Sequence, residues 1–290
     1  MILIADSGST KTSWSWSLPS GKWETLTTDG LNPLTSKEEQ ISEILSKVCH
    51  KCQENTLNTN GIEIHFYGAG CGTDQAKQYL NRLLSQSFPK ASIEVQTDLM
   101  GACRALWPNA IDDKPHIVGI LGTGSNACLF DGDTILENPP SLGFLLGDEG
   151  SGNHIGRHLL KDFIRKYMPT DLSQLFQEKY HLTYSKVIDQ LYHQPNANRY
   201  LAGFTLFAAN HRDHPFIHNL LEEVFGQFFD EMISPLSSKT KNLLLMGSVA
   251  VQFEEEIREI AQHHGFTVPK ILKQPMSGLI TFHLENQKNS

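Results

Sequence analysis

Residues 117–126 read Ile-Val-Gly-Ile-Leu-Gly-Thr-Gly-Ser-Asn, an apolar run that leads directly into a glycine-rich turn. A second apolar stretch follows at 127–130, and Asp131-Gly132 then marks a tight hairpin turn. Short apolar runs bounded by turn residues are typical of buried strands. This stretch therefore predicts a strand, a glycine turn and a second strand.

The N-terminus has the same order. The apolar residues 2–5 lead into Asp-Ser-Gly-Ser-Thr-Lys at 6–11, and residues 12–18 then alternate between large side chains and serine, as in a half-buried strand. Gly8 and Gly124 are 116 residues apart. The chain thus consists of two halves that open with the same unit, which indicates an internal repeat.

Strands alternate with helices in the rest of the chain, and this alternation predicts an α/β fold. The expected elements are a third strand at 23–28, later strands at 62–66, 93–95 and 243–246, helices from a Ser36 and Glu39 capping box to Cys52 and over 76–84, and a mostly helical segment between 148 and 234. We place one domain at residues 1–114 and a second, with a helical insertion, at 115–290.

The composition excludes several classes of protein. At roughly 100–200 residues per domain, 290 residues suffice for about two domains. The net charge of −8 argues against broad binding to nucleic acid or to an anionic membrane, which needs clustered Lys and Arg. Five cysteines do not suggest a disulfide framework, and no stretch reaches the ~18 apolar residues of a membrane span. The N-terminus lacks the basic flank and long apolar core of a signal peptide, so we expect a cytoplasmic protein.

A glycine turn between antiparallel strands exposes successive backbone N–H groups, and such a nest binds phosphate oxygens. One such turn is also compatible with an ordinary hairpin. Two, each opening one half of the chain, favour phosphate binding. Neither has the glycine spacing of a Walker A motif, and neither is followed directly by a helix as in a Rossmann fingerprint.

The ordered set of motifs resembles the N-acetylglucosamine kinase family, which is grouped with the BadF/BadG/BcrA/BcrD-type ATPases in the actin/hexokinase superfamily. The motifs that carry the resemblance are residues 6–12, Thr97-Asp98, residues 122–126, residues 147–151 and residues 245–249. The resemblance implies two actin-like (ribonuclease H-like) domains with a nucleotide and sugar cleft between them. It also implies the use of ATP and Mg²⁺ to phosphorylate an amino sugar, with N-acetylglucosamine and its 6-hydroxyl as the leading substrate and acceptor.

By the same resemblance, Asp6 holds Mg²⁺, a role that suits a carboxylate beside phosphates; the alternative is an aspartate that only starts a turn. The nucleotide would contact Gly8, Ser9, Thr10, Lys11, Thr123, Gly124, Gly203, Gly247 and Ser248. Lys11 is equally compatible with a solvated loop residue, and Gly203 with helix packing.

Asp98 is the predicted general base. It follows a short strand and precedes a helical stretch, so it should lie at the C-terminal end of a strand, where α/β proteins place their clefts. A carboxylate there can accept the proton of a sugar hydroxyl, although Asp is also a favoured helix N-cap. The resemblance implies that the sugar contacts Asp98 together with Asn32, Ser125, Asn126, Gly143, Asp148 and Glu149. For Asp148 and Glu149 the alternative is a pair of acids that suits a helix N-terminus.

Other functions stay open at this stage. An ATPase that activates an acyl-CoA dehydratase or reductase would need a shared iron–sulfur cluster, for which Cys103 is a conceivable ligand without a convincing second one. A non-catalytic sensor of sugar or nucleotide is a further alternative. The sequence does not choose among N-acetylglucosamine, glucosamine and N-acetylmuramic acid, or between a monomer and a homodimer.

Overall fold

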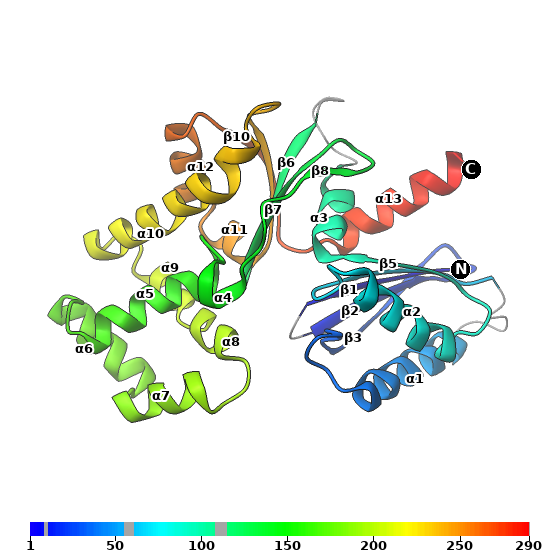
Figure 1. The fold of residues 1–290 in the computed structure, drawn as a ribbon, viewed down its shortest axis with the longest axis horizontal. Coiled ribbons are helices and arrows are strands. Elements are labelled where there is room, and N and C mark those ends of the chain that lie inside the picture. The colour runs from blue at the N-terminus through cyan, green and yellow to red at the C-terminus, as the bar shows by residue number, and fades with distance from the viewer. Residues whose placement is uncertain (9–10, 55–60, 108–114, 290) are drawn as a thin grey trace. The chain divides into compact units, whose positions relative to one another are not determined.

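A computed structural model describes residues 1–8, 11–54, 61–107 and 115–289 of the chain. It contains two compact units, one formed by Met1–Ala110 with Pro275–Ser290 and the other by Ile111–Gln274 (Figure 1). The expected boundary after residue 114 falls at the edge of a segment outside the described residues. The last sixteen residues differ from the expected division, because they pack with the first unit.

A mixed five-stranded sheet forms the first unit, in the order β3-β2-β1-β4-β5. Its strands are β1 (Ile2–Ser7), β2 (Lys11–Ser17), β3 (Trp23–Asp29), β4 (Glu63–Gly68) and β5 (Ser92–Thr97). The first three strands pair in antiparallel fashion, whereas β4 and β5 continue the sheet in parallel with β1.

The sheet of the second unit repeats this topology. Its order is β10-β9-β6-β7-β8, which read from the other end matches the first sheet strand for strand, including the parallel and antiparallel pairings. The strands are β6 (His116–Leu121), β7 (Ser125–Phe130), β8 (Ile135–Glu137), β9 (Asn242–Met246) and β10 (Thr267–Leu272). The predicted repeat and the predicted α/β fold are confirmed.

Helices cover both faces of the first sheet (Figure 1). The helices α1 (Glu38–Glu54) and α2 (Asp74–Ser87) lie on one face, and α3 (Asp98–Leu106) and α13 (Met276–Asn289) lie on the other. The core under α1 and α2 includes the fully buried Trp14, Phe66 and Leu45. Burial of each such side chain contributes roughly 1.5–3 kcal/mol.

The predicted capping box at the start of α1 is wrong. The helix begins at Glu38, and the Ser36 hydroxyl accepts a hydrogen bond from the Asn32 backbone N–H at 3.4 Å. The Gln40 side chain accepts from the Lys37 N–H at 3.2 Å instead. A serine hydroxyl can bond several nearby backbone groups, so the sequence pattern alone did not fix its partner.

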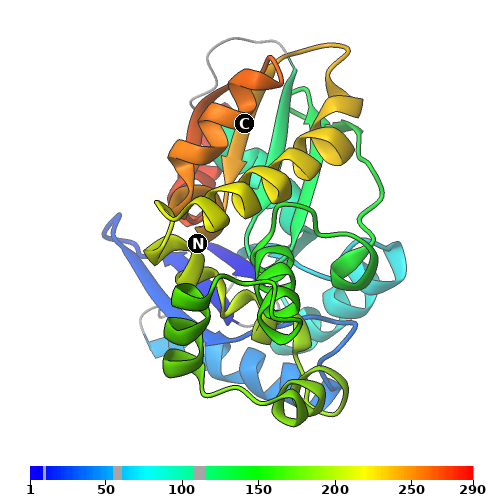
Figure 2. The same ribbon diagram turned by 90° about the vertical axis from the view of Figure 1, so that its left-hand side faces the viewer.

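The second unit carries a long helical segment between its β8 and β9 strands, drawn in green to yellow in Figure 2. Its helices are α4 (Gly143–Leu146), α5 (Gly152–Ile164), α6 (Thr170–Tyr180), α7 (Tyr184–Tyr192), α8 (Ala197–Ala202), α9 (Thr205–Asn210), α10 (Pro215–Phe228), η2 (Phe229–Ile233) and η3 (Ser234–Leu236), and α11 (Ser248–Gln252) and α12 (Glu254–His263) follow β9. Within the described parts of the chain, none of the helices combines the length and apolarity needed to span a bilayer.

A buried polar chain fixes α13 to the first unit. The Arg104 guanidinium donates to the Tyr67 hydroxyl at 2.8 Å, and Tyr67 in turn lies 2.8 Å from His283 Nε2. Because arginine can only donate, the Tyr67 hydroxyl directs its own hydrogen to His283 Nε2, which must be unprotonated. The His283 ring also stacks on the His65 ring at a centroid distance of 3.7 Å. Burial lowers the pKa of His283 to about 3, and the nearby charges of His65 and Arg104 act in the same direction.

This pKa predicts that acid destabilises the protein through His283. Between its ordinary pKa of 6.5 and about 3, only the unfolded chain takes up the proton, so stability is lost as the pH falls through this window. His283→Gln keeps an acceptor for Tyr67 but does not titrate. We expect the loss of unfolding free energy between pH 7.5 and 5.5 to be smaller in this variant by about 1 kcal/mol. The exposed His50→Gln serves as the control, and an equal acid sensitivity of wild type and His283→Gln, measured by urea unfolding, would contradict the prediction.

Candidate active site

The first glycine turn connects β1 to β2. Asp6 and Ser7 end β1, and the Gly8 N–H donates to the Lys11 carbonyl at 3.0 Å, which closes the turn. Lys11 is exposed at the start of β2. Two of the predicted nucleotide contacts, Ser9 and Thr10, lie outside the described residues. The fold therefore brings Asp6 and Lys11 to the two ends of one turn.

Asp98 lies at the C-terminal end of β5, which β4 separates from β1 in the sheet, and it is the first residue of α3. The helix cap is the Thr97 hydroxyl, which accepts from the Met100 N–H at 3.1 Å. Asp98 is therefore not the N-cap, and its Oδ1 accepts from the Leu99 N–H at 2.9 Å. Burial raises the pKa of the Asp98 carboxyl above its ordinary value, although the backbone hydrogen bonds oppose the shift.

The two carboxyl groups of Asp6 and Asp98 interact. The pKa of Asp6 is raised to about 7, chiefly by burial and in part by the negative charge of Asp98, against the smaller opposing effect of Lys11. Two partly buried carboxylates at one sheet edge, with a single lysine to offset them, form an environment that favours either a proton or a cation.

We therefore expect the buried Asp6 carboxyl to lower the unfolding free energy at neutral pH. The folded chain retains a proton on Asp6 between pH 3.8 and about 7 that the unfolded chain has lost, so the unfolding free energy falls as the pH rises through this window. Asp6→Asn removes this cost. At pH 8 we expect the variant to gain on the order of 1–3 kcal/mol in unfolding free energy, with a much smaller gain at pH 4.

Thermal and urea unfolding at both pH values would measure this gain, with the exposed Asp133→Asn as a matched control. An Asp6→Asn variant that is no more stable than wild type at pH 8 would contradict the burial of an uncompensated carboxylate at this position.

These carboxylates also fit a magnesium ion. Mg²⁺ is usually held by one or two carboxylates together with phosphate oxygens and water, so it needs no all-protein cage. Over the described ranges, no group of three or more His, Cys, Asp or Glu side chains is placed to hold a metal ion. The mutual repulsion of Asp6 and Asp98 is what a divalent cation would relieve.

Asn32 lies in a loop that the β1–β2 hairpin holds. The adjacent Leu31 backbone accepts from and donates to the Ser7 hydroxyl, at 3.1 and 3.0 Å. Asn32 Oδ1 accepts from the Leu34 N–H at 2.9 Å, which leaves the amide Nδ2 as the group available to a ligand. The Asn32 amide also packs directly against the Cα of Gly70, whose φ is +81°, so that a side chain at Gly70 would overlap it.

The sequence analysis missed this loop after β4 as a part of the site. Gly68 ends β4, the Ala69 N–H donates to the Ser7 carbonyl at 2.8 Å, and the charge of Asp98 raises the pKa of Cys71, after the larger effect of burial. The available signal was the repeat, because the loop after β4 occupies the same place in the first sheet as Gly247-Ser248 in the second.

The second glycine turn holds an aspartate from a distant loop. Its Gly122 N–H donates to the Gly124 carbonyl at 2.9 Å, and the Ser125 N–H donates to Asp148 Oδ1 at 3.2 Å. A Cβ atom on Gly124 would lie 2.9 Å from both carboxylate oxygens of Asp148, so only glycine allows this approach. The structure therefore brings together the turn and Asp148, which the sequence assigned to nucleotide and sugar.

A buried asparagine on α5, which the sequence analysis did not single out, joins this group. Asn153 Nδ2 donates to the Thr123 carbonyl at 2.7 Å and to Asp148 Oδ2 at 2.8 Å. The start of α5 thereby contacts both the turn and the aspartate. Asn153 is fully buried, which could have been anticipated only from its position two residues into a helix that follows the Gly-Asp-Glu-Gly-Ser motif.

The rest of the predicted sugar loop is partly exposed. Gly143 begins the single-turn α4 with φ +67°, and Asp148 itself has φ +61°, a conformation that costs non-glycine residues energy. Burial raises the pKa of Glu149, and the charges of Glu231 and Asp148 add to this effect. Asn126 Oδ1 accepts from the Ala127 N–H at 2.9 Å and from Asn138 Nδ2 at 3.1 Å.

Gly247 also lies against the second turn. Its Cα packs on the Leu121 carbonyl and beside the Gly122 nitrogen, and its φ of +129° is open only to glycine. Ser248 then begins α11. Gly203 instead is the C-cap of α8, where an added Cβ would lie 3.1 Å from the Tyr200 carbonyl oxygen; the preceding Ala202 packs against Gly152 at the start of α5.

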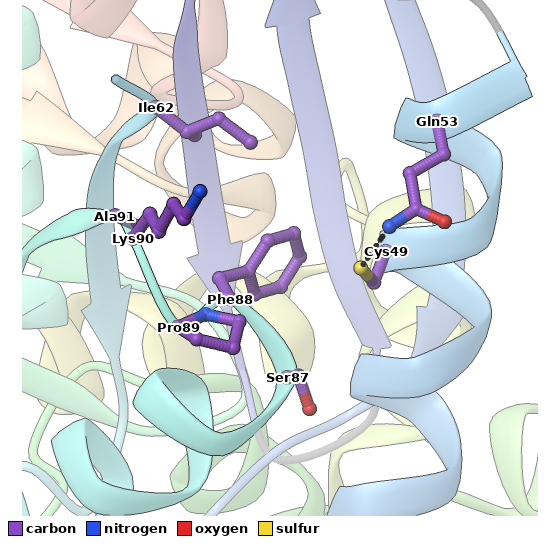
Figure 3. Close-up of a pocket in the computed structure, with 8 residues that line it drawn as sticks. All are labelled: Cys49, Gln53, Ile62, Ser87, Phe88, Pro89, Lys90 and Ala91. Carbon is purple, nitrogen blue, oxygen red and sulfur yellow. Dashed lines mark hydrogen bonds between the residues drawn. The ribbon is translucent and has the colours of Figure 1, made fainter. Parts of the chain in front are cut away.

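Two cavities lie apart from these residues. One, of about 180 Å³ in the first unit, is lined by Cys49 and Gln53 of α1, by Ile62, and by the 87–91 loop (Figure 3). The other, of about 640 Å³ in the second unit, is lined by residues of α5, α6 and α7. Neither lining includes a predicted site residue.

Comparison with known proteins places the chain in a family. The sequence model of the BadF/BadG/BcrA/BcrD ATPase family matches residues 5–281. A structure from Porphyromonas gingivalis, described as a candidate N-acetylglucosamine kinase, is 37% identical with a TM-score of 0.88, and the match covers 99% of this chain and 100% of that one. No curated protein gives a significant match.

More distant structures share the fold alone. A candidate N-acetylglucosamine kinase from Chromobacterium violaceum is 14% identical with a TM-score of 0.72, and the match covers 97% of this chain and 98% of that one. A ROK family glucokinase from Streptomyces griseus, in complex with glucose and AMPPNP, is 12% identical with a TM-score of 0.54, covering 97% of each chain.

Proposed function

The chain belongs to the BadF/BadG/BcrA/BcrD ATPase family, and from this premise we propose that it is an ATP-dependent sugar kinase. We further propose an amino sugar as substrate, with N-acetylglucosamine first and its 6-hydroxyl as the acceptor. The observation that carries the proposal is Asp98, a carboxylate of raised pKa at the end of β5, which leaves capping of α3 to Thr97. The 37% identical relative supports the choice of sugar.

Asp98 is the proposed general base. A carboxyl with a raised pKa holds a proton more firmly than an ordinary aspartate, so it accepts the proton of the sugar hydroxyl more readily as that hydroxyl attacks the γ-phosphate. The Leu99 N–H donates to Asp98 Oδ1, which orients the carboxyl group toward its proposed role. Phosphoryl transfer otherwise relies mainly on positioning and charge neutralisation.

The two glycine turns are the proposed phosphate-binding elements. Backbone N–H groups bind phosphate oxygens without cationic side chains, which suits a chain with a net charge of −8. When bound, Mg²⁺ would be held by Asp6 and would neutralise charge on the transferred phosphoryl group. Lys11, at the edge of the first turn, is placed to add positive charge there.

Asp148 and Asn32 are the proposed sugar ligands. An ionised carboxylate only accepts hydrogen bonds, so Asp148 suits the hydroxyls of a sugar. Asn32 offers its NH₂ group, because its carbonyl oxygen already accepts from Leu34. Discrimination among N-acetylglucosamine, glucosamine and N-acetylmuramic acid would depend on the groups that surround the 2- and 3-substituents.

A second function, activation of an acyl-CoA enzyme by a shared iron–sulfur cluster, has less support. Cys103 is fully buried within α3, whereas a ligand to a cluster shared between subunits must reach the surface. Iron-free, colourless protein after anaerobic purification would count against this function.

The decisive experiment offers the purified protein ATP, Mg²⁺ and each of the three amino sugars, and identifies the phosphorylated product by mass spectrometry and NMR. We expect N-acetylglucosamine 6-phosphate as the main product. Absence of any phosphorylated sugar, with ATP hydrolysis unchanged by sugar, would reject the kinase function.

A further inference from the structure

We propose that Asn153 is a positioning residue that clamps the Asp148 carboxylate to the second glycine turn, so that the sugar-binding acid and the phosphate-binding turn are held as one rigid group. The inference rests on the proposed function for the roles of Asp148 and the turn. It adds a residue and a coupling between the two ligands that the sequence motifs do not contain.

Three hydrogen bonds make the clamp. The Asn153 side-chain NH₂ group donates to the Thr123 carbonyl at 2.7 Å and to Asp148 Oδ2 at 2.8 Å, and the Asn153 backbone N–H donates to the same Thr123 carbonyl at 3.1 Å. The preceding Gly152 N–H donates to the Gly122 carbonyl at 2.8 Å. The first turn of α5 therefore donates hydrogen bonds to the carbonyls of Gly122 and Thr123, the first two residues of the glycine turn.

Asp148 is restrained on its other side by the turn itself. Its Oδ1 accepts from the Ser125 N–H, and its carboxylate lies flat against Gly124, where a methyl group would not fit. Its positive φ must be maintained by such tertiary contacts, because an aspartate in this conformation is strained. A shift of Asp148 would thus be transmitted to Gly124 and Ser125, and a shift of the turn to Asp148.

The clamp requires an amide at position 153. Both partners of the NH₂ group are acceptors, so the residue must supply two donors from a buried position, which an amide does and a carboxylate does not. The orientation is settled by these partners, and Asn153 Oδ1 is left buried without a partner among the described residues. Leaving one acceptor unpaired is a cost that a merely structural residue would avoid.

Asn153→Asp tests the clamp through its charge. The variant keeps the shape of the side chain but places a second carboxyl group beside Asp148, and two adjacent carboxyls retain a shared proton to higher pH than either alone. A shared proton restores a hydrogen bond to Asp148, whereas two ionised carboxylates repel, so the defect should grow as the pH rises. We expect the sugar KM, relative to wild type, to rise at least about tenfold at pH 8 and much less at pH 6.

Asn153→Ala is the uncharged comparison. It removes both donors without adding charge, so its raised sugar KM should not depend on pH. Because the Thr123 carbonyl loses the side-chain bond and keeps only the one from the Asn153 backbone N–H, the dissociation constant of ADP should rise severalfold in both variants. Ionisable groups around the clamp include Glu149, on which the charges of Glu231, Asp148 and Arg157 act, and His154, the residue after Asn153 in α5. They are common to all three proteins, and expressing each value relative to wild type removes their effect. The exposed Asn210→Asp controls for the charge change.

A readout without catalysis completes the test. The Tm deficit of Asn153→Asp relative to Asn153→Ala should be larger at pH 8 than at pH 5, because ionisation of both carboxyl groups adds repulsion in the folded chain. Equal pH dependence of Tm in the two variants would overturn the proposal whether or not the protein is a kinase, as would an unchanged sugar KM or unchanged ADP binding. If wild type phosphorylates no sugar, the proposed function fails while Tm and ADP binding still decide the clamp.

Discussion

Asp98→Asn is expected to lower kcat for sugar phosphorylation by about 10²–10⁴-fold while leaving the binding of sugar and ATP nearly unchanged, because proton transfer to a positioned base contributes a factor of this size. Asparagine keeps the side-chain oxygen that accepts from the Leu99 N–H, so the start of α3 should be preserved. The raised pKa also predicts that wild-type kcat falls as the pH drops through a range above the ordinary 3.8 of aspartate, since the base must be ionised to act.

Steady-state kinetics and calorimetric binding on the same preparations measure both effects. Because the variant loses a buried carboxylate, it should also be at least as stable as wild type at pH 8. Undiminished kcat in Asp98→Asn would remove Asp98 as the base. A loss of sugar binding equal to the loss of kcat would instead assign it to substrate binding.

Gly247→Ala is expected to have the largest effect on stability, with a loss of about 2–4 kcal/mol in unfolding free energy. Two causes add. The backbone at Gly247 has φ +129° and ψ 167°, a region essentially closed to residues with a side chain, and the new methyl group would overlap the Leu121 carbonyl. Leu121 ends β6 and Gly122 opens the second glycine turn, which is a proposed phosphate-binding element, so we also expect the KM for ATP to rise severalfold.

Gly265→Ala is the control for a positive-φ glycine without close packing, because Gly265 has φ +75° and no atom lies within 4 Å of an added Cβ. We expect this control to lose only about 1 kcal/mol. Urea unfolding of the two variants measures the difference. Equal stability of Gly247→Ala and Gly265→Ala would show that the close packing on Leu121 is not maintained in solution.

Much of the fold could be predicted from local pattern. The apolar run at 117–121 and its continuation at 127–130 form β6 and β7, paired so that Leu121 lies opposite Ser125 across the glycine turn. The alternation at 12–18 similarly forms β2. Such patterns succeed because a strand reveals its buried face with a period of two residues.

The assignment of α13 to the first unit could not be predicted from the local sequence pattern. The apolar residues of α13 do not form one stripe, so its pattern does not indicate which sheet it covers. Its place is decided by Gly278, whose Cα packs on the Ala105 carbonyl, and by His283, whose partner Tyr67 is 216 residues away. Neither contact can be predicted from the spacing of residues within α13.

The sequence by itself determined the two repeated strand, turn and strand units, the α/β class, and the residue types that suit phosphate, a proton and sugar hydroxyls. Each depends on neighbours along the chain. Only the tertiary structure decided that Asn32 packs on Gly70 and that Asn153 joins Asp148 to Thr123. The physical reason is that these contacts depend on distance in space. The fold brings together residues that lie far apart in the sequence, and their spacing along the chain does not predict which of them meet.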